Sequence, residues 1–325
     1  MNWIKKIISV TDKIKKIVKN RPSASDIASS LWRSCPSCSK ITLKESIIKQ
    51  FFICECGFHF DYPPRERFKT FGFKEGYQEI KAPTYMNADP LKFQFSDSKY
   101  IDKRKKYQKN TNQETALLAA YGEIEDISCV IVCSNFEFGG SAWSPSESEY
   151  FLRAIDTAIE KKVDLFCTIY ATGGIAVTTG VNGLTSGMIK GVIGLKSLEE
   201  NNIITCAIAS SKTTGGPFAS TFYSHQICTI ESKNSTDTLF SGKRVSASSQ
   251  TTAVPDNFGD SEWVKKSGLC DFVFNDRTEI SKKLVLITKI LKNKFNNQNK
   301  KINLNKLSSE EPTSEQILSN TSKAV

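Results

Sequence analysis

Two glycine pairs are the residues of this chain most suited to chemistry. Gly173 and Gly174 follow the apolar run 164–171, and Gly215 and Gly216 follow the apolar run 203–209. Each run is short and rich in β-branched residues, which is typical of a buried strand. Between a strand and a helix, paired glycines leave backbone N–H groups open to hold an anion or a developing oxyanion. One such pair could simply permit a tight turn, but two in corresponding positions favour a site.

Four cysteines form a second constellation. Cys35 and Cys38 have the C-x2-C spacing of a zinc knuckle, and fifteen residues separate them from Cys54 and Cys56. Two such knuckles predict a zinc ribbon whose four thiolates close a tetrahedral, structural site. The second knuckle is one residue short. Three possibilities stay open: both of its cysteines ligate, His59 replaces one of them, or the ribbon binds no metal and is held by Trp32 and neighbouring aromatic residues.

Several chemistries have no counterpart in the sequence. The two histidines are His59 and His225, and neither lies near a G-x-S-x-G elbow, which the chain lacks. No Walker A loop and no G-x-G-x-x-G motif occurs. His225 is interpreted as an ordinary polar residue on or just past the helix that follows Gly216. The chain therefore suits a reaction in which a substrate or cofactor supplies the base and the protein stabilises an enolate.

The elements that must position the glycine pairs alternate along the chain. Strand patterns cover 129–133, 164–171 and 203–209, and helical patterns cover 146–161, 180–199 and a stretch after Pro217. This alternation predicts an α/β domain with parallel strands. Gly183, Gly187 and Gly191 are spaced four apart on the middle helix, which favours close approach of another helix or backbone.

Composition and charge divide the 325 residues into four regions. Hydrophobic residues make up 39% and charged residues 24%, as in ordinary soluble domains. No apolar stretch reaches the length of a membrane span, and the N-terminus lacks the apolar core of a signal peptide. The expected regions are a basic amphipathic helix and linker at 1–30, the ribbon at 31–62, the α/β domain at 63–297 and a disordered polar tail at 298–325.

The net charge of +10 is concentrated at the N-terminus, where residues 1–50 contribute +8. The basic helix there could contact a membrane surface, nucleic acid or an acidic partner, or pack on its own protein or on a partner subunit. The cysteines outside the cluster lie in apolar runs, so we expect buried thiols in a reducing compartment rather than disulfides.

The order of motifs resembles the β subunit of the bacterial or plastid acetyl-CoA carboxylase carboxyltransferase, over most of the chain. The ribbon after Trp32 is similar to the zinc domain of that family. The other matching stretches are Asp89–Phe93 (DPLxF), Asp97–Tyr100 (DSKxY), Gln108–Thr111 (QKxT), Phe136–Ser141 (FxFxxGGS), Thr172–Gly174 (SGG), Thr213–Ser220 (TTGGxxAS), Gly242–Val245 (GPRV) and Pro255–Asp271 (PxGF…AE…GxxD).

This resemblance implies a crotonase-like (ClpP/crotonase) carboxyltransferase fold with an N-terminal zinc ribbon. It implies transfer of a carboxyl group from carboxybiotin to acetyl-CoA, giving malonyl-CoA for fatty acid synthesis. The implied partners are a carboxyltransferase α subunit in an α2β2 assembly, biotin carboxyl carrier protein and biotin carboxylase, in the cytoplasm or a plastid stroma. Gly173 and Gly174 would be catalytic, and Gly139, Gly140, Gly215, Gly216 and Arg244 would bind substrate.

Three departures from the family pattern bear on activity, and the short second knuckle is one of them. Ala176 stands where the family has an arginine, and Trp143 stands where it has a glycine. Either the chain is a working enzyme that has diverged, or catalysis is weakened while assembly persists. Two readings of other classes are a zinc-ribbon protein that binds nucleic acid through its basic N-terminus and a crotonase-like enzyme that acts on an acyl-CoA without biotin.

Overall fold

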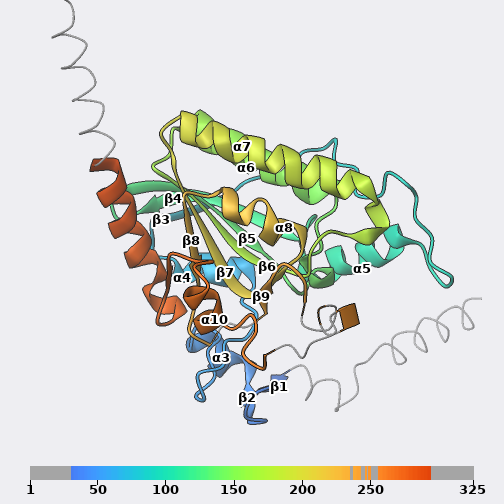
Figure 1. Ribbon diagram of the computed structural model, residues 1–325, viewed down its shortest axis with the longest axis horizontal. Helices are drawn as coiled ribbons and strands as arrows, with labels where there is room; N and C mark the ends of the chain where they lie inside the picture. The colour runs from blue at the N-terminus through green and yellow to red at the C-terminus, as the bar shows by residue number, and fades with distance from the viewer. Residues whose placement is uncertain (1–30, 235–236, 243–245, 247, 250–254, 294–325) are drawn as a thin grey trace, which may run out of the picture. The chain divides into compact units, whose positions relative to one another are not determined.

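The chain is described by a computed structural model (Figure 1) that covers residues 31–234, 237–242, 246, 248–249 and 255–293. The expected N-terminal helix, the polar tail and Arg244 lie outside these residues. By its internal contacts the chain divides into two units, Met1–Phe60 and Asp61–Val325, a division two residues before the expected end of the ribbon at residue 62. Among the described helices, none is long and apolar enough to cross a membrane.

The first unit contains the ribbon. An antiparallel hairpin of β1 (Trp32–Ser34) and β2 (Ile41–Leu43) is followed by α3 (Lys44–Lys49). Cys35 and Cys38 lie in the hairpin turn, where the N–H of Cys35 donates to the Lys40 carbonyl at 2.9 Å. Phe52 and Phe60 are buried, whereas Trp32 is 46% exposed. Trp32 is therefore not the residue that holds this small core together.

The second unit is built on one mixed sheet with the strand order β10-β8-β7-β6-β5-β4-β3, and β9 also pairs with β7. From β5 to β10 the pairs are parallel, and β3-β4-β5 are antiparallel. The strands are β3 (Phe73–Glu79), β4 (Leu117–Ile124), β5 (Ile127–Ser134), β6 (Leu165–Thr172), β7 (Ile204–Thr214), β8 (Ile227–Ile230), β9 (Thr238–Leu239) and β10 (Phe272–Val273). The expected parallel α/β arrangement is confirmed.

Helices cover both faces of this sheet. Side chains such as Phe151, Phe166 and Trp143 fill one face under α6 (Pro145–Lys161) and α7 (Lys190–Glu200), which pack side by side (Figure 1). Phe68 and Phe274 belong to the core of the other face, with residues of α4 (Pro64–Thr70) and of a helical stretch from residue 280. Among the described residues, the other α-helices of this unit are α5 (Tyr100–Thr111), α8 (Gly216–Ala219) and α10 (Ser261–Lys266).

The alternation of side chains along a strand explains on which face of the sheet the cysteines of β5 lie. Because successive side chains of a strand point to opposite faces, Val130 and Val132 join the α6 face while Cys129 and Cys133 join the other. All ten cysteines are free, and the six outside the ribbon are buried, as expected for small apolar side chains.

Helix α6 begins and ends where its sequence indicates. Ser144 caps its N-terminus in a capping box with Glu147, Pro145 follows at a position that needs no N–H, and Lys162 ends it in the left-handed conformation at φ 51°. The expected helix 146–161 is thus confirmed. The expected helix 180–199 is instead a π-helical segment η3 (Gly183–Ile189) that leads into α7.

The expected close approach at the spaced glycines is also confirmed. A Cβ added to Gly187 would lie 2.6 Å from Ser148 Oγ on α6, and one added to Gly191 would lie 2.7 Å from Thr221 Cγ2. Side chains at these positions would push the packed elements apart.

Candidate functional site

Three glycine pairs meet at the carboxyl end of the central strands. Parallel register places Thr172 of β6 opposite Thr213 of β7, so the two turns that follow lie next to each other. A Cβ added to Gly215 would lie 2.9 Å from Gly174 Cα, which shows how closely the two backbones approach. Gly174 has φ 115° and Gly215 has φ 75°, backbone conformations that suit glycine.

The third pair comes from the loop after β5. Gly139 and Gly140 have φ values of 59° and 71°, and the Gly140 carbonyl accepts a hydrogen bond from the N–H of Gly173 at 2.8 Å. A Cβ on Gly139 would lie 2.7 Å from the ring of Tyr107. The structure therefore brings together the six glycines that the sequence singled out. Arg244 lies outside the described residues.

The expectation that Gly173 and Gly174 leave open N–H groups is corrected by the structure. The N–H of Gly174 donates to Thr172 Oγ1 at 3.1 Å, and that of Gly173 is used by Gly140. The reason is that no helix starts here: the segment after Gly174 forms a parallel bridge between Ile175 and Trp143. A 3-10 turn follows only at Val177–Thr179.

The second pair also differs from the expectation. Helix α8 begins at Gly216 and has four residues, so the helix expected after Pro217 is present but short. The N–H of Gly215 donates to the Phe240 carbonyl at 2.9 Å. The N–H groups of Gly216 and Ile175 have no acceptor among the residues that the structure describes. The sequence reasoning had singled out Gly216 but missed Ile175, which follows directly after the first glycine pair.

His225 is part of the core. It is 5% exposed, its Nδ1 lies 2.8 Å from the Thr221 carbonyl and its Nε2 lies 3.0 Å from Thr168 Oγ1. Since a carbonyl only accepts, Nδ1 carries the proton and Nε2 accepts from the Thr168 hydroxyl. Burial lowers the pKa of His225 to about 4. The expectation that His225 lies on or just past the helix after Gly216 agrees with its position directly after the 3-10 turn Phe222–Ser224.

Trp143, where the resemblance leads us to expect a glycine, fills the core beneath the candidate site. Its side chain is fully buried, with its ring 5.4 Å from Phe151 and 6.3 Å from Tyr170. Its backbone donates to the Gly174 carbonyl at 2.9 Å and accepts from the N–H of Ala176 at 2.8 Å. The indole thus occupies the interior, and the backbone of Trp143 supports the first glycine turn.

The ribbon cysteines form the candidate metal centre. The four Sγ atoms lie within 4.8 Å of one another, with Cys35 and Cys56 3.7 Å apart and Cys38 and Cys54 3.8 Å apart. A tetrahedral zinc with Zn–S bonds of about 2.3 Å requires sulfur separations of about 3.8 Å. The thiolates of this cluster therefore fit zinc, which would stabilise the ribbon when bound.

The short second knuckle closes through Gly57. At φ 85°, Gly57 donates its N–H to the Cys54 carbonyl at 2.7 Å, and the N–H of Cys54 donates to the Phe58 carbonyl at 2.8 Å. This tight turn brings Cys56 into the cluster, which His59 does not join. The alternative in which both cysteines face the metal is the one that the geometry supports.

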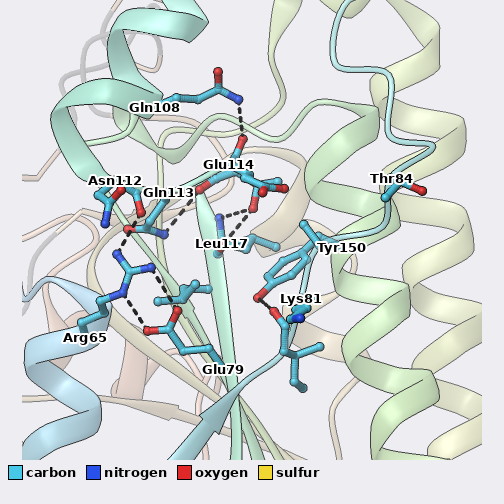
Figure 2. A pocket seen from close by; sticks show the side chains of 14 residues that line it. Arg65, Glu79, Lys81, Thr84, Gln108, Asn112, Gln113, Glu114, Leu117 and Tyr150 are labelled. Atoms are coloured by element: carbon cyan, nitrogen blue, oxygen red, sulfur yellow. Dashed lines mark hydrogen bonds and ion pairs between the residues drawn. The ribbon is translucent and has the colours of Figure 1, made fainter.

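A separate cleft of about 740 Å³ lies beside β3 and β4 (Figure 2). Arg65 donates to both carboxylate oxygens of Glu79 at 2.7 and 3.0 Å, and to the Asn112 carbonyl at 2.9 Å. Tyr150 of α6 donates to the Ile80 carbonyl at 2.7 Å. Gln113, in the same wall, accepts from the side chain of Asn135, the residue that begins the loop leading to Gly139. This cleft is distinct from the glycine turns.

The comparisons with known proteins decide the family. A family model described as a carboxyl transferase domain matches residues 86–322. The chain is 30% identical over 317 residues to the acetyl-coenzyme A carboxylase carboxyl transferase subunit beta of Pelagibacter ubique, covering 97% of each chain. The chain belongs to this carboxyl transferase β-subunit family. A Hirschia baltica protein of the same name is 28% identical, over 84% of this chain and 77% of its own.

The fold agrees with this family. A transcarboxylase 12S structure matches with a TM-score of 0.55 at 18% identity, over 71% of this chain. This carboxyl transferase chain spans about two fifths of the transcarboxylase chain, 41% of its length. The expected α/β carboxyltransferase fold of the crotonase type, with a four-cysteine cluster at the N-terminus, is thus confirmed.

Proposed function

We propose that the chain is the carboxyl transferase β subunit of an acetyl-CoA carboxylase and moves a carboxyl group from carboxybiotin to acetyl-CoA. The observation that carries this proposal is the convergence of the three glycine pairs at one sheet edge, in a chain of the carboxyl transferase family. Where side chains are missing, a thioester can approach the backbone closely.

The reaction needs an enolate of acetyl-CoA. Loss of a Cα proton places negative charge on the thioester oxygen, and the carbanion carbon then attacks the carboxyl carbon to give malonyl-CoA. Carboxybiotin would supply the carboxyl group by cleavage of its bond between the ureido nitrogen and the carboxyl carbon, and the released ureido nitrogen would take up the proton lost from acetyl-CoA. The contribution of this chain is to hold the thioester and stabilise its oxygen, and one backbone donor in such a hole is worth about 3–4 kcal/mol.

We place the donors at Ile175 and Gly216 rather than at Gly173 and Gly174. The latter two N–H groups already have protein acceptors, while Ile175 and Gly216 have none among the described residues. We propose that Gly173, Gly174 and Gly215, which have no side chains, form the surface on which the acyl group of the substrate lies. Gly139 and Gly140 support that surface from the loop after β5, and Arg244 remains a proposed substrate contact.

We propose further that the chain acts with a carboxyltransferase α subunit, in an α2β2 assembly served by biotin carboxyl carrier protein and biotin carboxylase. Apolar side chains are exposed along the segment that follows the first glycine turn, among them Val177 (88%), Val181 (67%) and Ile193 (64%). An exposed apolar surface next to a site is typical of a protein interface. We place the reaction in the cytoplasm, or in the plastid stroma if the chain is plastid-encoded, with zinc in the ribbon.

The test is carboxyl transfer by the chain purified with its α subunit. In the reverse direction, malonyl-CoA and biocytin should yield acetyl-CoA and carboxybiocytin. Ile175→Pro removes a backbone N–H that bonds to no described residue, so the loss should be about 10²–10³-fold in kcat, while Ile175→Val serves as its control. Gly174→Pro is less informative because it also breaks the bond to Thr172. A folded, α-bound wild-type chain without transfer would refute the proposed function.

A further inference from the structure

A buried carboxylate outside the glycine turns holds their geometry. We infer that Glu147, clamped by Arg104, is a positioning residue for the thioester site, an inference that rests on the proposed function. Glu147 lies in the first turn of α6 and is fully buried, and Arg104 of α5 is 4% exposed. Neither residue was singled out by the sequence, because they are 43 positions apart and meet only in the fold.

The two oxygens of Glu147 join four segments of the chain. Oε1 accepts from Arg104 Nη2 at 2.9 Å and from the N–H of Ala116 at 3.0 Å. Oε2 accepts from the N–H of Ser144 at 2.9 Å and from the Ser144 hydroxyl. Weaker contacts reach Oε2 from Ser146 Oγ at 3.3 Å and Arg104 Nη1 at 3.4 Å. Helix α5, the residue just before β4, the loop after β5 and the start of α6 therefore share one carboxylate.

The same loop holds the first glycine turn in place. Four hydrogen bonds run between the two loops: Gly173 N–H to the Gly140 carbonyl at 2.8 Å, Thr172 Oγ1 to the Ser141 carbonyl at 2.7 Å, Trp143 N–H to the Gly174 carbonyl at 2.9 Å, and Ala176 N–H to the Trp143 carbonyl at 2.8 Å. Ser144, the next residue, is the one that Glu147 binds. The carboxylate thus anchors the end of the loop that supports the turn.

This arrangement also decides which donor stays open. In an extended segment, successive backbone groups point to opposite sides. The carbonyl of Gly174 and the N–H of Ala176 both face Trp143, so the N–H of Ile175 between them faces away. If the loop after β5 shifted, the bridge between Trp143 and Ile175 would loosen, and the N–H of Ile175 would lose its fixed direction.

The positioning role of Glu147 requires its carboxylate to be ionised. Burial alone would raise the pKa of Glu147, but the Arg104 charge and the hydrogen bonds from Arg104, Ser144 and Ala116 hold it below its ordinary value. Each oxygen accepts from at least two donors. In Glu147→Gln, an NH2 group at the Oε1 position faces only donors, whereas one at the Oε2 position faces the N–H of Ser144 and forces the Ser144 hydroxyl to turn from donor to acceptor. The substitution therefore disturbs the network while keeping the volume of the side chain.

The kinetic test compares Glu147→Gln with Glu149→Gln in the complex with the α subunit. Glu149 lies on the same helix, and its carboxylate pairs with Lys190 at the surface at 2.8 Å. We expect Glu147→Gln to lower kcat by about tenfold or more, since a small misplacement of the reacting groups is costly, with KM for malonyl-CoA changed by less than about twofold. Glu149→Gln should match the wild type in both constants.

A second variant, Arg104→Lys, tests the inference if Glu147→Gln folds poorly. Arg104→Lys keeps the positive charge but loses the fork that also reaches Ser146 Oγ at 2.6 Å and the Glu114 carbonyl at 3.2 Å. We expect Arg104→Lys to lower kcat less than Glu147→Gln does, and to leave KM for malonyl-CoA almost unchanged. A helix-capping role alone would lower the melting temperature and leave kcat unchanged, and that result would overturn the inference.

Hydrogen exchange on the β chain separates this inference from the proposed function. Peptides covering 172–177 should exchange faster in Glu147→Gln than in the wild type, and Glu149→Gln should exchange at the wild-type rate. This measurement needs no turnover, so it stands even if the assigned reaction is wrong. Unchanged exchange at 172–177 in a folded Glu147→Gln chain would refute the positioning role.

Discussion

Thr172 shows how one hydroxyl sets the conformation of the first glycine turn. Its Oγ1 donates to the Ser141 carbonyl at 2.7 Å and accepts from the N–H of Gly174 at 3.1 Å. The side chain is fully buried at the end of β6. The hydroxyl therefore links the turn to the loop after β5. It also accepts a hydrogen bond from the N–H of Gly174, which would otherwise be available to the substrate.

Removing this hydroxyl should harm both stability and transfer. Thr172→Val leaves the Ser141 carbonyl and the Gly174 N–H without their partner, which costs about 1–3 kcal/mol for a buried polar group. We expect lower thermal stability and a kcat reduced by about tenfold, because the turn is free to shift. Thr172→Ser keeps the hydroxyl and should stay near the wild type. A Val variant with full turnover would show that the turn needs no such link.

His225 predicts a specific pH dependence of stability. Its pKa in the folded chain is about 4, below the ordinary value of 6.5. Folding thus favours the neutral ring, and this contribution is complete above pH 6.5 and is lost as the pH falls toward 4. Between pH 7 and pH 5 the free energy of unfolding should drop by about 2 kcal/mol on this account.

The measurement is chemical denaturation of the wild type and of His225→Gln at both pH values. The variant cannot take up the proton, so its loss of stability between pH 7 and pH 5 should be smaller than that of the wild type by about 2 kcal/mol. Equal losses in the two proteins would contradict the assignment of His225 as the group responsible.

At the scale of elements, we propose that the ribbon depends on a zinc ion, which its four thiolates fit. The hairpin of β1 and β2 has only three residues in each strand, and an isolated two-stranded hairpin is marginally stable. A tetrahedral zinc would join this hairpin to the knuckle that contains Cys54 and Cys56. Metal binding and folding of the unit are then coupled.

We therefore expect about one zinc per chain in protein purified under reducing conditions. Cys38→Ser should release the zinc and lower the protection of residues 31–60 against proteolysis, because a closed thiolate site needs every ligand. Cys270→Ser, which removes a buried thiol outside the cluster, is the control and should retain the metal. Zinc that stays bound in Cys38→Ser would remove this residue from the ligand set.

At the scale of the whole molecule, the second unit exposes apolar residues on the stretch that follows the first glycine turn. Ile189 and Ile193, four positions apart, lie on the same face of the helical segment there and are 52% and 64% exposed. Two exposed isoleucines on one helical face favour burial of that face against another chain. The site and the proposed partner surface would then be continuous along the sequence.

Charge on this surface should weaken association with the α subunit. Ile193→Glu is expected to lower the affinity for the α subunit by about tenfold or more, because a carboxylate would be buried at the contact. Ile290→Glu alters an equally exposed isoleucine, at 58%, and should leave the affinity unchanged. The two are compared by titration of purified subunits. Equal affinities would place the partner surface elsewhere.

Local patterns in the sequence determined the elements and the constellations. Short apolar runs predicted β5, β6 and β7, because strands buried on both faces are apolar throughout. A helical spacing of apolar residues predicted α6, because a helix buried on one face repeats its apolar residues every three to four positions. Cysteine spacing identified the ribbon, and paired glycines after successive strands identified the turns. Parallel strands in one sheet must then bring Gly173 and Gly215 to the same edge. The family resemblance, read from the same residues, agrees with the comparisons.

The hydrogen-bond partners were decided only by the tertiary structure. Whether the N–H of Gly173 is open depends on the Gly140 carbonyl, which lies on a different loop, and no local pattern encodes that contact. The shortness of α8, the pairing of Glu147 with Arg104 and the place of Trp143 depend likewise on segments distant in the sequence. A backbone polar group is satisfied by whatever the fold brings near it. The sequence therefore predicted a candidate site, and only the tertiary structure decided which backbone N–H groups there have no acceptor among the described residues.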